Sequence, residues 1–242
     1  MDHPSVGDVA SQEVSRSMKS RLIVDYYHRL NILALSCFNP STLFHKINAL
    51  PWYLGLLRTW SDSLGYRTGD SVLDVGCATG QLTTYMAHRG VVAYGVDKST
   101  KMLQKANTSD IDGARFELAS ALDLPFENKR FDYVIAASLI NIISEPTIAL
   151  IEMARVCKPD GKVSVLVPQA GITDEDVASL ANYMNLTGFS RAALTAWHRR
   201  APKMQQEKLL EYFSNAGFHN TYIETYLGGM VMTVTGTSRI NG

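Results

Sequence analysis

The chain has 242 residues, of which 46% are hydrophobic and 19% are charged, and its formal net charge is zero. This size and composition fit one globular α/β domain with an added covering segment better than two separate domains. A protein with a large nucleic-acid footprint would usually be basic, so the charge balance argues against that role. No apolar run reaches the length of a membrane span, and the first residues resemble neither a signal nor a transit peptide. We therefore expect a cytoplasmic protein.

The three cysteines, Cys37, Cys77 and Cys157, are odd in number and too far apart in the chain for a C-x-x-C motif. Their use indicates a reducing compartment. Cys77 and Cys157 lie in apolar surroundings and are expected to be small buried residues. We predict no metal site.

The first 70 residues predict a helical extension ahead of the sheet. Residues 1–15 are polar and small, so we expect them to be poorly ordered. An apolar stripe at helical spacing follows, made of Met18, Leu22, Tyr26, Leu30 and Leu33. A second helix is predicted over residues 51–64, with Pro51 in its first turn. The extension is therefore assigned to residues 16–70 and the main domain to residues 71–242.

From residue 71 onward, apolar strands alternate with helices, which predicts a parallel sheet with right-handed crossovers. The expected strands are 71–75, 91–96, 114–118, 133–137 and 162–167. A short helix around Met102 and Leu103, a long helix over 145–157 and a turn at 159–161 connect them.

The C-terminal third interrupts this alternation. Residues 168–215 are helical and irregular, which is too long for a simple connection and predicts a lid. Two last strands, 218–225 and 230–235, are joined through Gly228 and Gly229.

The stretch VLDVGCATGQ at residues 72–81 organises the domain. It predicts a buried strand, a sharp turn at Gly76 and a helix beginning near Thr79, which is how α/β folds build a nucleotide pocket. A dinucleotide fingerprint would read G-x-G-x-x-G, whereas Ala78 stands between Gly76 and Gly80 here. Asp74 at the strand end would repel a pyrophosphate but suits a ligand with an ammonium group and no phosphate.

Five segments, in order, resemble the class I S-adenosylmethionine-dependent methyltransferases. Residues 72–81 resemble motif I, although Ala78 replaces the usual glycine. YGVD at 94–97 resembles motif II, residues 119–126 the D-A-x-x-L-P-F stretch, 131–137 motif IV, and 155–161 the R-V-L-K-P-G-G stretch. The resemblance implies a seven-stranded, mostly parallel Rossmann-like sheet whose last strand is antiparallel, with helices on both faces. It also implies S-adenosyl-L-methionine as the cofactor.

The resemblance assigns the cofactor-binding residues. Asp97 would accept hydrogen bonds from both ribose hydroxyls, or cap the next helix, or do both. Ser120 stands where the family has an aspartate that meets the adenine amino group, and Asp123 is the competing candidate for that contact. The full predicted set is Asp74, Gly76, Gly80, Asp97, Lys98, Met102, Ser120, Ala121 and Ser138. Asn141 would lie near the transferred methyl group.

The catalytic residues cannot be assigned from the sequence. If the acceptor must lose a proton, His28, Tyr26 and Tyr27 of the first helix and Tyr183 and His198 of the lid are weak candidates for a base. Each is more simply explained as a packed or surface residue. Two basic clusters are best explained as solvated faces, although either could meet an anionic group on the acceptor: Arg16, Lys19, Arg21 and Arg29, and His198, Arg199, Arg200 and Lys203.

The favoured hypothesis is methyl transfer to a small-molecule acceptor beneath the N-terminal helices and the lid, with the acceptor atom and the oligomeric state left open. A quinone or lipid-like acceptor is the alternative within enzymes. A non-catalytic subunit that binds adenosylmethionine is the alternative outside them. Asp74 and Ala78 make a NAD-dependent enzyme a distant third.

Overall fold

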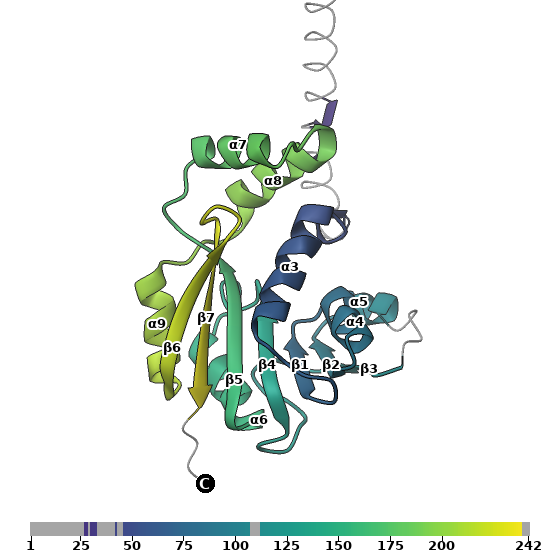
Figure 1. Cartoon of the computed structure of the whole chain (residues 1–242), viewed down its shortest axis with the longest axis vertical. Helices are drawn as coiled ribbons and strands as arrows, with labels where there is room; N and C mark the ends of the chain where they lie inside the picture. Colours follow the sequence, from purple (N-terminus) through teal and green to yellow (C-terminus); the bar gives the residue numbers. More distant parts are fainter. Residues whose placement is uncertain (1–26, 29, 33–41, 43–45, 107–111, 239–242) are drawn as a thin grey trace, which may run out of the picture. The chain divides into compact units, whose positions relative to one another are not determined.

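The computed structural model describes residues 27–28, 30–32, 42, 46–106 and 112–238 (Figure 1). The chain divides into two compact units, one made of Met1–Leu50 with Asp174–Arg200, the other of Pro51–Thr173 with Ala201–Gly242. Several predictions concern residues outside the described part: the order of residues 1–15, most of the first apolar stripe, Tyr26, Cys37, and the basic cluster Arg16, Lys19, Arg21 and Arg29. They stay predictions.

A seven-stranded sheet with the order β3-β2-β1-β4-β5-β7-β6 forms the centre of the larger unit. The strands are β1 (Ser71–Val75), β2 (Val92–Asp97), β3 (Ala114–Leu118), β4 (Phe131–Ala137), β5 (Cys157–Pro168), β6 (Phe218–Tyr226) and β7 (Val231–Ser238). The first five strands pair in parallel, whereas β7 is antiparallel to both of its neighbours. The expected sheet with an antiparallel last strand is confirmed.

Helices cover both faces of this sheet (Figure 1). One face carries α3 (Pro51–Ser63), α4 (Gln81–His88) and α5 (Thr100–Ala106), and the other carries α6 (Pro146–Val156) and α9 (Gln206–Asn215). Side-chain alternation along the strands matches these two layers. On β5, Ser164 accepts a hydrogen bond from Trp60 of α3 at 3.0 Å, whereas its neighbour Val163 joins the core beneath α6.

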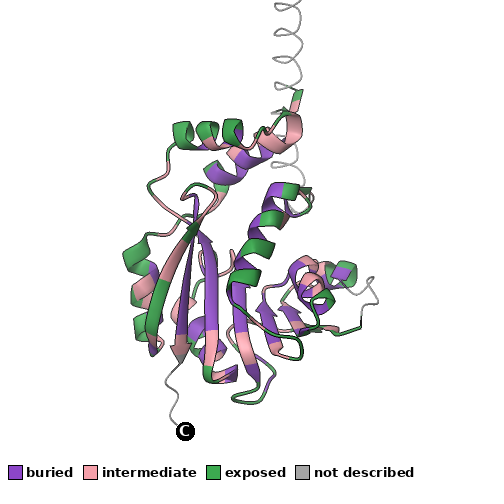
Figure 2. Ribbon diagram, in the orientation of Figure 1, coloured by how far each residue is buried: buried purple, intermediate pink, exposed green. Residues whose placement is uncertain are grey.

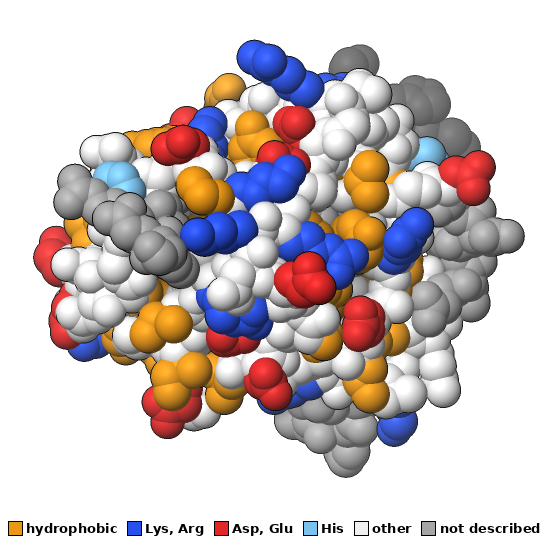
Figure 3. All heavy atoms as spheres, turned by 90° about the horizontal axis from the view of Figure 1, so that it is seen from below, with side chains coloured by type: hydrophobic (Ala, Val, Ile, Leu, Met, Phe, Trp, Pro, Cys, Tyr) orange, Lys and Arg blue, Asp and Glu red, His pale blue; other side chains and the backbone are white. Residues whose placement is uncertain are grey.

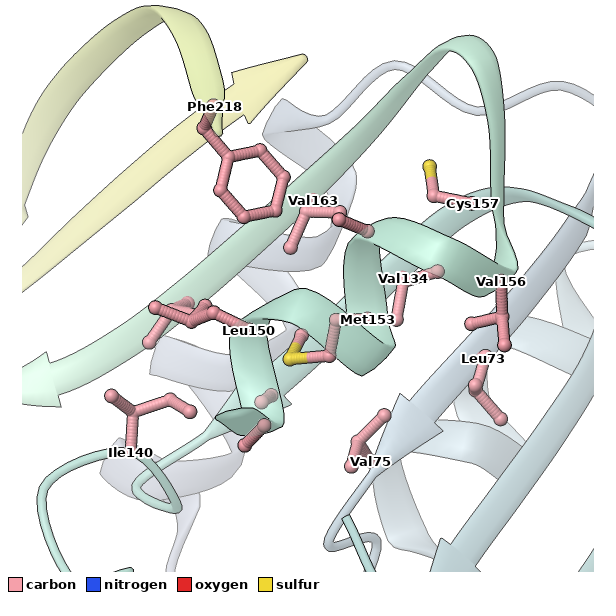
Figure 4. Close-up of a cluster of buried hydrophobic side chains, with 14 of the residues drawn as sticks. Leu73, Val75, Val134, Ile140, Leu150, Met153, Val156, Cys157, Val163 and Phe218 are labelled. Atoms are coloured by element: carbon pink, nitrogen blue, oxygen red, sulfur yellow. The ribbon is translucent and has the colours of Figure 1, made fainter. Parts of the chain in front are cut away.

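The central strands are hydrophobic because both of their faces are covered. Figure 2 shows the buried residues concentrated in these strands. In Figure 4, Leu73 and Val75 of β1 and Val134 of β4 lie in one cluster with Leu150 and Met153 of α6. Each of these five side chains has 0% exposure, so this layer is closed to water. A ligand site must therefore lie outside this layer, and the carboxyl ends of the parallel strands are the usual place for one.

The predicted strand boundaries differ most at β5. The expected turn at 159–161 lies inside this strand, which begins at Cys157. The pairing with β4 shifts register between Phe131 and Tyr133. Asp160 takes a left-handed φ of 62°, and a Cβ on Gly161 would lie 2.7 Å from the Asp132 carbonyl oxygen. The turn residues therefore bend the strand without ending it.

The segment predicted as a lid is divided between the two units. Its first helices, α7 (Asp174–Tyr183) and α8 (Gly188–Arg200), belong to the smaller unit, whereas α9 packs on α6 and on β6 of the larger unit. Helix α3, from the predicted extension, also belongs to the larger unit. Within the described part of the chain, no helix combines the length and the hydropathy that a membrane crossing requires.

Candidate cofactor site

The turn between β1 and α4 depends on three residues with left-handed backbone. Gly76, Ala78 and Gly80 have φ values of 78°, 48° and 71°. A Cβ on Gly76 would meet the Leu139 side chain at 3.3 Å, whereas one on Gly80 would lie 2.5 Å from the ring of Phe116. Gly80 is thus required for packing against β3, and Gly76 keeps the backbone bare at the open edge. Ala78 holds a strained conformation that a glycine would adopt freely.

Asp74 is a buried carboxylate whose one side-chain hydrogen-bond partner, within the described part of the chain, is Thr83. Its side chain accepts a hydrogen bond from the Thr83 hydroxyl of α4 at 2.7 Å. Burial raises the pKa of Asp74 to about 7, against the lowering effect of Thr83, and the nearby charge of Asp97 raises it further. A cationic ligand would supply the missing countercharge. Perturbed carboxylates of this kind concentrate at functional sites.

Asp97, the last residue of β2, fixes the same turn. Its Oδ2 accepts the backbone N–H of Ala78 at 3.0 Å, and its Oδ1 accepts that of Ser99 at 2.8 Å. Helix α5 begins at Thr100, and the Ser99 hydroxyl accepts the Met102 N–H at 3.4 Å, so Ser99 caps the helix. Each Asp97 oxygen keeps a free lone pair for a ligand hydroxyl.

The loop after β3 carries the predicted adenine contacts. The Ser120 hydroxyl accepts the Leu122 N–H at 3.2 Å, and Ser120 forms a bridge with Asp123. Both Ser120 and Asp123 are exposed, and Ala121 is half-buried. A hydroxyl used in this way still has a hydrogen to donate and a second lone pair to offer.

A partly buried ion pair holds the following residues of this loop. Glu152 of α6 accepts the Leu124 N–H at 2.9 Å. Arg155 binds Glu152 and also donates to the carbonyl oxygens of Leu124 and Phe126 at 2.8 and 2.7 Å. Charge-assisted hydrogen bonds on both sides of Leu124 fix the loop's path. The sequence predicted only a structural role for the Arg155 stretch, and these contacts define it.

At the end of β4, Ser138 has a left-handed φ of 53° and its N–H donates to the Leu166 carbonyl at 2.7 Å. Tyr53, in the first turn of α3, is buried beside it. Burial raises the pKa of Tyr53, the Ser138 hydroxyl lowers it, and the charge of Asp74 raises it. These three side chains therefore interact at the carboxyl ends of β1 and β4.

Sequence reasoning missed two members of this group, Thr83 and Tyr53. A signal existed for Thr83, because a helix that follows a strand end turns its first residues back over that strand. Tyr53 precedes the sheet in the chain, and only the fold brings it to the edge. Of the remaining predicted residues, Lys98 is exposed and Met102 is half-buried on α5.

The predicted bases occupy the smaller unit. His28 contacts the rings of Tyr27 and Phe189 edge-on. His198 is 7% exposed, and its Nε2 lies 3.9 Å from Asp174. Tyr183 is 85% exposed. The two histidines thus pack against neighbouring side chains of the same unit. The choice among these bases stays a prediction.

The second basic cluster is partly neutralised, because Arg199 donates to Asp174 at 2.8 Å. Among the residues that the structure describes, no three His, Cys, Asp or Glu side chains gather in a way that could hold a metal ion. Cys77 and Cys157 are buried and free, as predicted.

Known proteins share this sequence pattern and this fold. A family model described as "Methyltransferase domain" matches residues 73–165. Demethylmenaquinone methyltransferase of Staphylococcus aureus is 29% identical over 182 residues, covering 69% of this chain and 75% of that protein.

Among solved structures, a SAM-dependent methyltransferase from Aquifex aeolicus has a TM-score of 0.63 at 18% identity, covering 82% of this chain and 98% of that one. Phosphoethanolamine N-methyltransferase 2 of Haemonchus contortus, solved with S-adenosyl-L-methionine, has a TM-score of 0.62 at 17% identity, covering 86% and 59%. The family match, the sheet order and the acidic turn after β1 agree with the predicted class I S-adenosylmethionine-dependent methyltransferase fold, and the chain carries a methyltransferase domain over residues 73–165.

Proposed function

We propose that this enzyme methylates a small-molecule acceptor at the carboxyl ends of β4 and β5, with the cofactor held across β3, β2 and β1. The observation that carries the proposal is Asp74, a buried carboxylate with a raised pKa that forms no ion pair with any cation in the described part of the chain. The amino group of the cofactor supplies the charge that this site lacks.

The strand order supports the cofactor's direction. Ser120 follows β3, Asp97 ends β2 and Asp74 lies near the end of β1, and these strands are adjacent in the sheet. Adenine, ribose and the methionine part then follow one another along the edge. The sulfonium falls near Ser138 and Tyr53, and the acceptor lies beyond it.

The main task of the protein in this reaction is to align the acceptor atom with the S–CH₃ bond. The acceptor atom attacks the methyl carbon, the S–CH₃ bond breaks, and S-adenosylhomocysteine leaves. Holding the two reactants in line can supply about 7–11 kcal/mol of the barrier. The proton that the acceptor loses goes to solvent or to a base. Burial raises the pKa of Tyr53 above the ordinary value of a phenol, which makes Tyr53 a poor choice for that base.

A reduced quinone or related lipid-like ring is the acceptor to test first. The support is the 29% identity with demethylmenaquinone methyltransferases. An anionic acceptor has weaker support, because Arg199 of the basic cluster is engaged by Asp174.

Calorimetric titration with S-adenosylmethionine, S-adenosylhomocysteine and NAD tests the cofactor site. We expect the first two to bind and NAD not to bind. Transfer of a labelled methyl group to 1,4-naphthohydroquinone, kept reduced under anaerobic conditions, tests the acceptor. Binding of NAD without binding of S-adenosylmethionine would refute the proposal. If only charged compounds of a cell extract were labelled, the acceptor would be a charged molecule and not a quinone.

A further inference from the structure

Two amide side chains follow the carboxyl ends of β4 and β5, beyond the proposed sulfonium position. Asn141 follows β4, and Gln169 follows β5 directly. The Asn141 Oδ1 and the Gln169 Oε1 are both buried, and neither has a hydrogen-bond partner among the residues that the structure describes. Buried carbonyl oxygens without a donor are uncommon in folded proteins, and each costs about 1–3 kcal/mol.

Both amides border the same short segment, Pro202–Met204. The Nδ2 of Asn141 donates to the Pro202 carbonyl at 2.9 Å, which orients its Oδ1 away from that segment. Gln169 bridges to Met204, and Met204 exchanges hydrogen bonds of 2.9 Å with Pro168 and Ala170. The two unpartnered oxygens therefore belong to one structured edge of the larger unit.

The chemistry of these atoms restricts their ligand. An amide oxygen can only accept a hydrogen bond, so the ligand must present O–H or N–H groups. A carboxylate or phosphate has no hydrogen to offer and would be repelled. An oxidised quinone offers only acceptors, whereas a hydroquinone offers two hydroxyl donors. Met204, which pairs with this edge through its backbone, is half-buried, and a methionine side chain adapts readily to an apolar ring.

We propose that Asn141 and Gln169 form the acceptor's hydroxyl-recognition subsite and select the reduced, phenolic form of an aromatic acceptor. The inference rests on the proposed function, because the cofactor's direction places the acceptor here. It names two specificity-determining residues and the form of substrate they select.

The test measures binding in the presence of saturating S-adenosylhomocysteine, so that no turnover occurs. The probes are 1,4-naphthohydroquinone and 1,4-dimethoxynaphthalene, which has the same ring and no O–H group. We expect wild type to prefer the hydroquinone by roughly tenfold or more, since each hydrogen bond contributes a factor of a few. Gln169→Met should reduce this preference roughly fivefold. The matched control Gln104→Met, at an exposed position on α5, should leave it unchanged.

Thermal melting of the free protein separates recognition from a structural role. Gln169→Met should not lower the melting temperature, because it removes an unpaired buried acceptor. A lower melting temperature with an unchanged preference would mean that the amide holds a structural water, and would overturn the inference while leaving the proposed function intact. If the cofactor product binds but neither naphthalene compound does, the hydroxyl-aromatic subsite is refuted, and the calorimetric test of the cofactor still decides the proposed function.

Discussion

Asp74 and Asp132 belong to adjacent strands of one sheet, yet their surroundings are opposite. Asp132 lies near the start of β4. Burial raises its pKa, but Lys158, at 2.8 Å, and Ser71 lower it more, so that the pKa lies below the ordinary value. Asp74, near the end of β1, has one hydroxyl partner and a pKa raised to about 7. Figure 3 views the edge where the parallel strands begin, and acidic and basic side chains are interspersed there. Residues of the chain itself satisfy the carboxylate at the starting edge, whereas in the proposed function a ligand completes the one at the carboxyl edge.

The sharpest test of this comparison replaces each carboxylate by its amide. At pH 8, Asp74→Asn should stabilise the free protein by up to about 4 kcal/mol, because it removes a buried charge whose pKa is raised. It should also weaken S-adenosylmethionine binding roughly 100-fold, through the loss of a charge-assisted contact. Asp132→Asn should do the reverse, lowering stability by about 1 kcal/mol with little effect on binding. Chemical denaturation and calorimetry measure both quantities.

If Asp74→Asn destabilised the fold and left cofactor affinity unchanged, Asp74 would be a structural residue like Asp132. The comparison between the two edges would then fail.

Asp97 lies at the carboxyl edge like Asp74, but the chain already supplies hydrogen bonds to its carboxylate, as it does for Asp132. The donors are the backbone N–H groups of Ala78 and Ser99. Asp97→Ala should weaken cofactor binding by roughly 2–3 kcal/mol, since it removes hydrogen bonds to a charged group and releases the turn at Ala78. The fold should survive, because Asp97 lies at a strand end. Isothermal titration with S-adenosylhomocysteine checks the value, with Gln104→Ala, at an exposed position on α5, as the control. Binding equal to wild type would show that the ribose lies elsewhere.

The pH dependence of binding separates the two edges without mutation. A cationic ligand binds the ionised form of Asp74, so below pH 7 binding must release a proton. The affinity for S-adenosylmethionine should therefore be level above pH 8 and roughly tenfold weaker at pH 6. Titrations in buffers of different ionisation enthalpy measure the proton directly. A flat profile between pH 6 and 8 would mean that Asp74 is already ionised in the free protein.

The pKa shifts of Asp74 and Asp132 make the free energy of unfolding change with pH in opposite directions. The pKa of Asp74 is raised on folding, so its favourable contribution at low pH is lost as the pH rises through 7. The pKa of Asp132 is lowered, so its contribution is present at neutral pH and is lost as the pH falls through its folded value.

Much of the fold was predictable because local patterns determine it. Apolar strands separated by helices specify a parallel sheet, and the turn with Gly76 and Gly80 locates its functional edge. The path of β5 was not predictable, because Pro159 and Gly161 are usual turn residues and only the pairing with β4 keeps them in a strand. The division of residues 168–215 between two units likewise depends on contacts that are distant in the chain.

The candidate site was predictable only where a motif carried it. Asp74 and Asp97 follow from their positions at strand ends. Tyr53 and Gln169 show no such pattern, because a tyrosine in an amphipathic helix and a glutamine after a strand are common in any fold. Their significance arises from burial beside Ser138 and from an unpartnered oxygen, which only three-dimensional packing reveals.

A smaller test concerns backbone strain at the two edges. Ala78 at the carboxyl edge and Asp160 at the starting edge both have left-handed φ, at 48° and 62°. Ala78→Gly and Asp160→Gly should each stabilise the protein by about 1 kcal/mol or less, because relief of strain exceeds the added freedom of the unfolded chain. Denaturation midpoints check this. Only Ala78→Gly should change cofactor affinity, because position 78 lies in the turn that Asp97 holds, and glycine makes that turn more flexible. Equal effects of the two substitutions on affinity would remove that distinction.

The smallest expected effect is at Ser120, which the motif resemblance aligns with an aspartate. Its hydroxyl already accepts the Leu122 N–H, so a contact with adenine would be its second hydrogen bond. Ser120→Ala should weaken S-adenosylhomocysteine binding by about 1 kcal/mol or less, because the Ala121 backbone and the packing of the ring remain. Ser120→Asp should be tolerated and should tighten binding by a similar amount, since a carboxylate is the stronger acceptor. Asp123→Ala should change little. A large loss for Asp123→Ala with none for Ser120→Ala would transfer the adenine contact to Asp123 and shift the position of the ring along the loop.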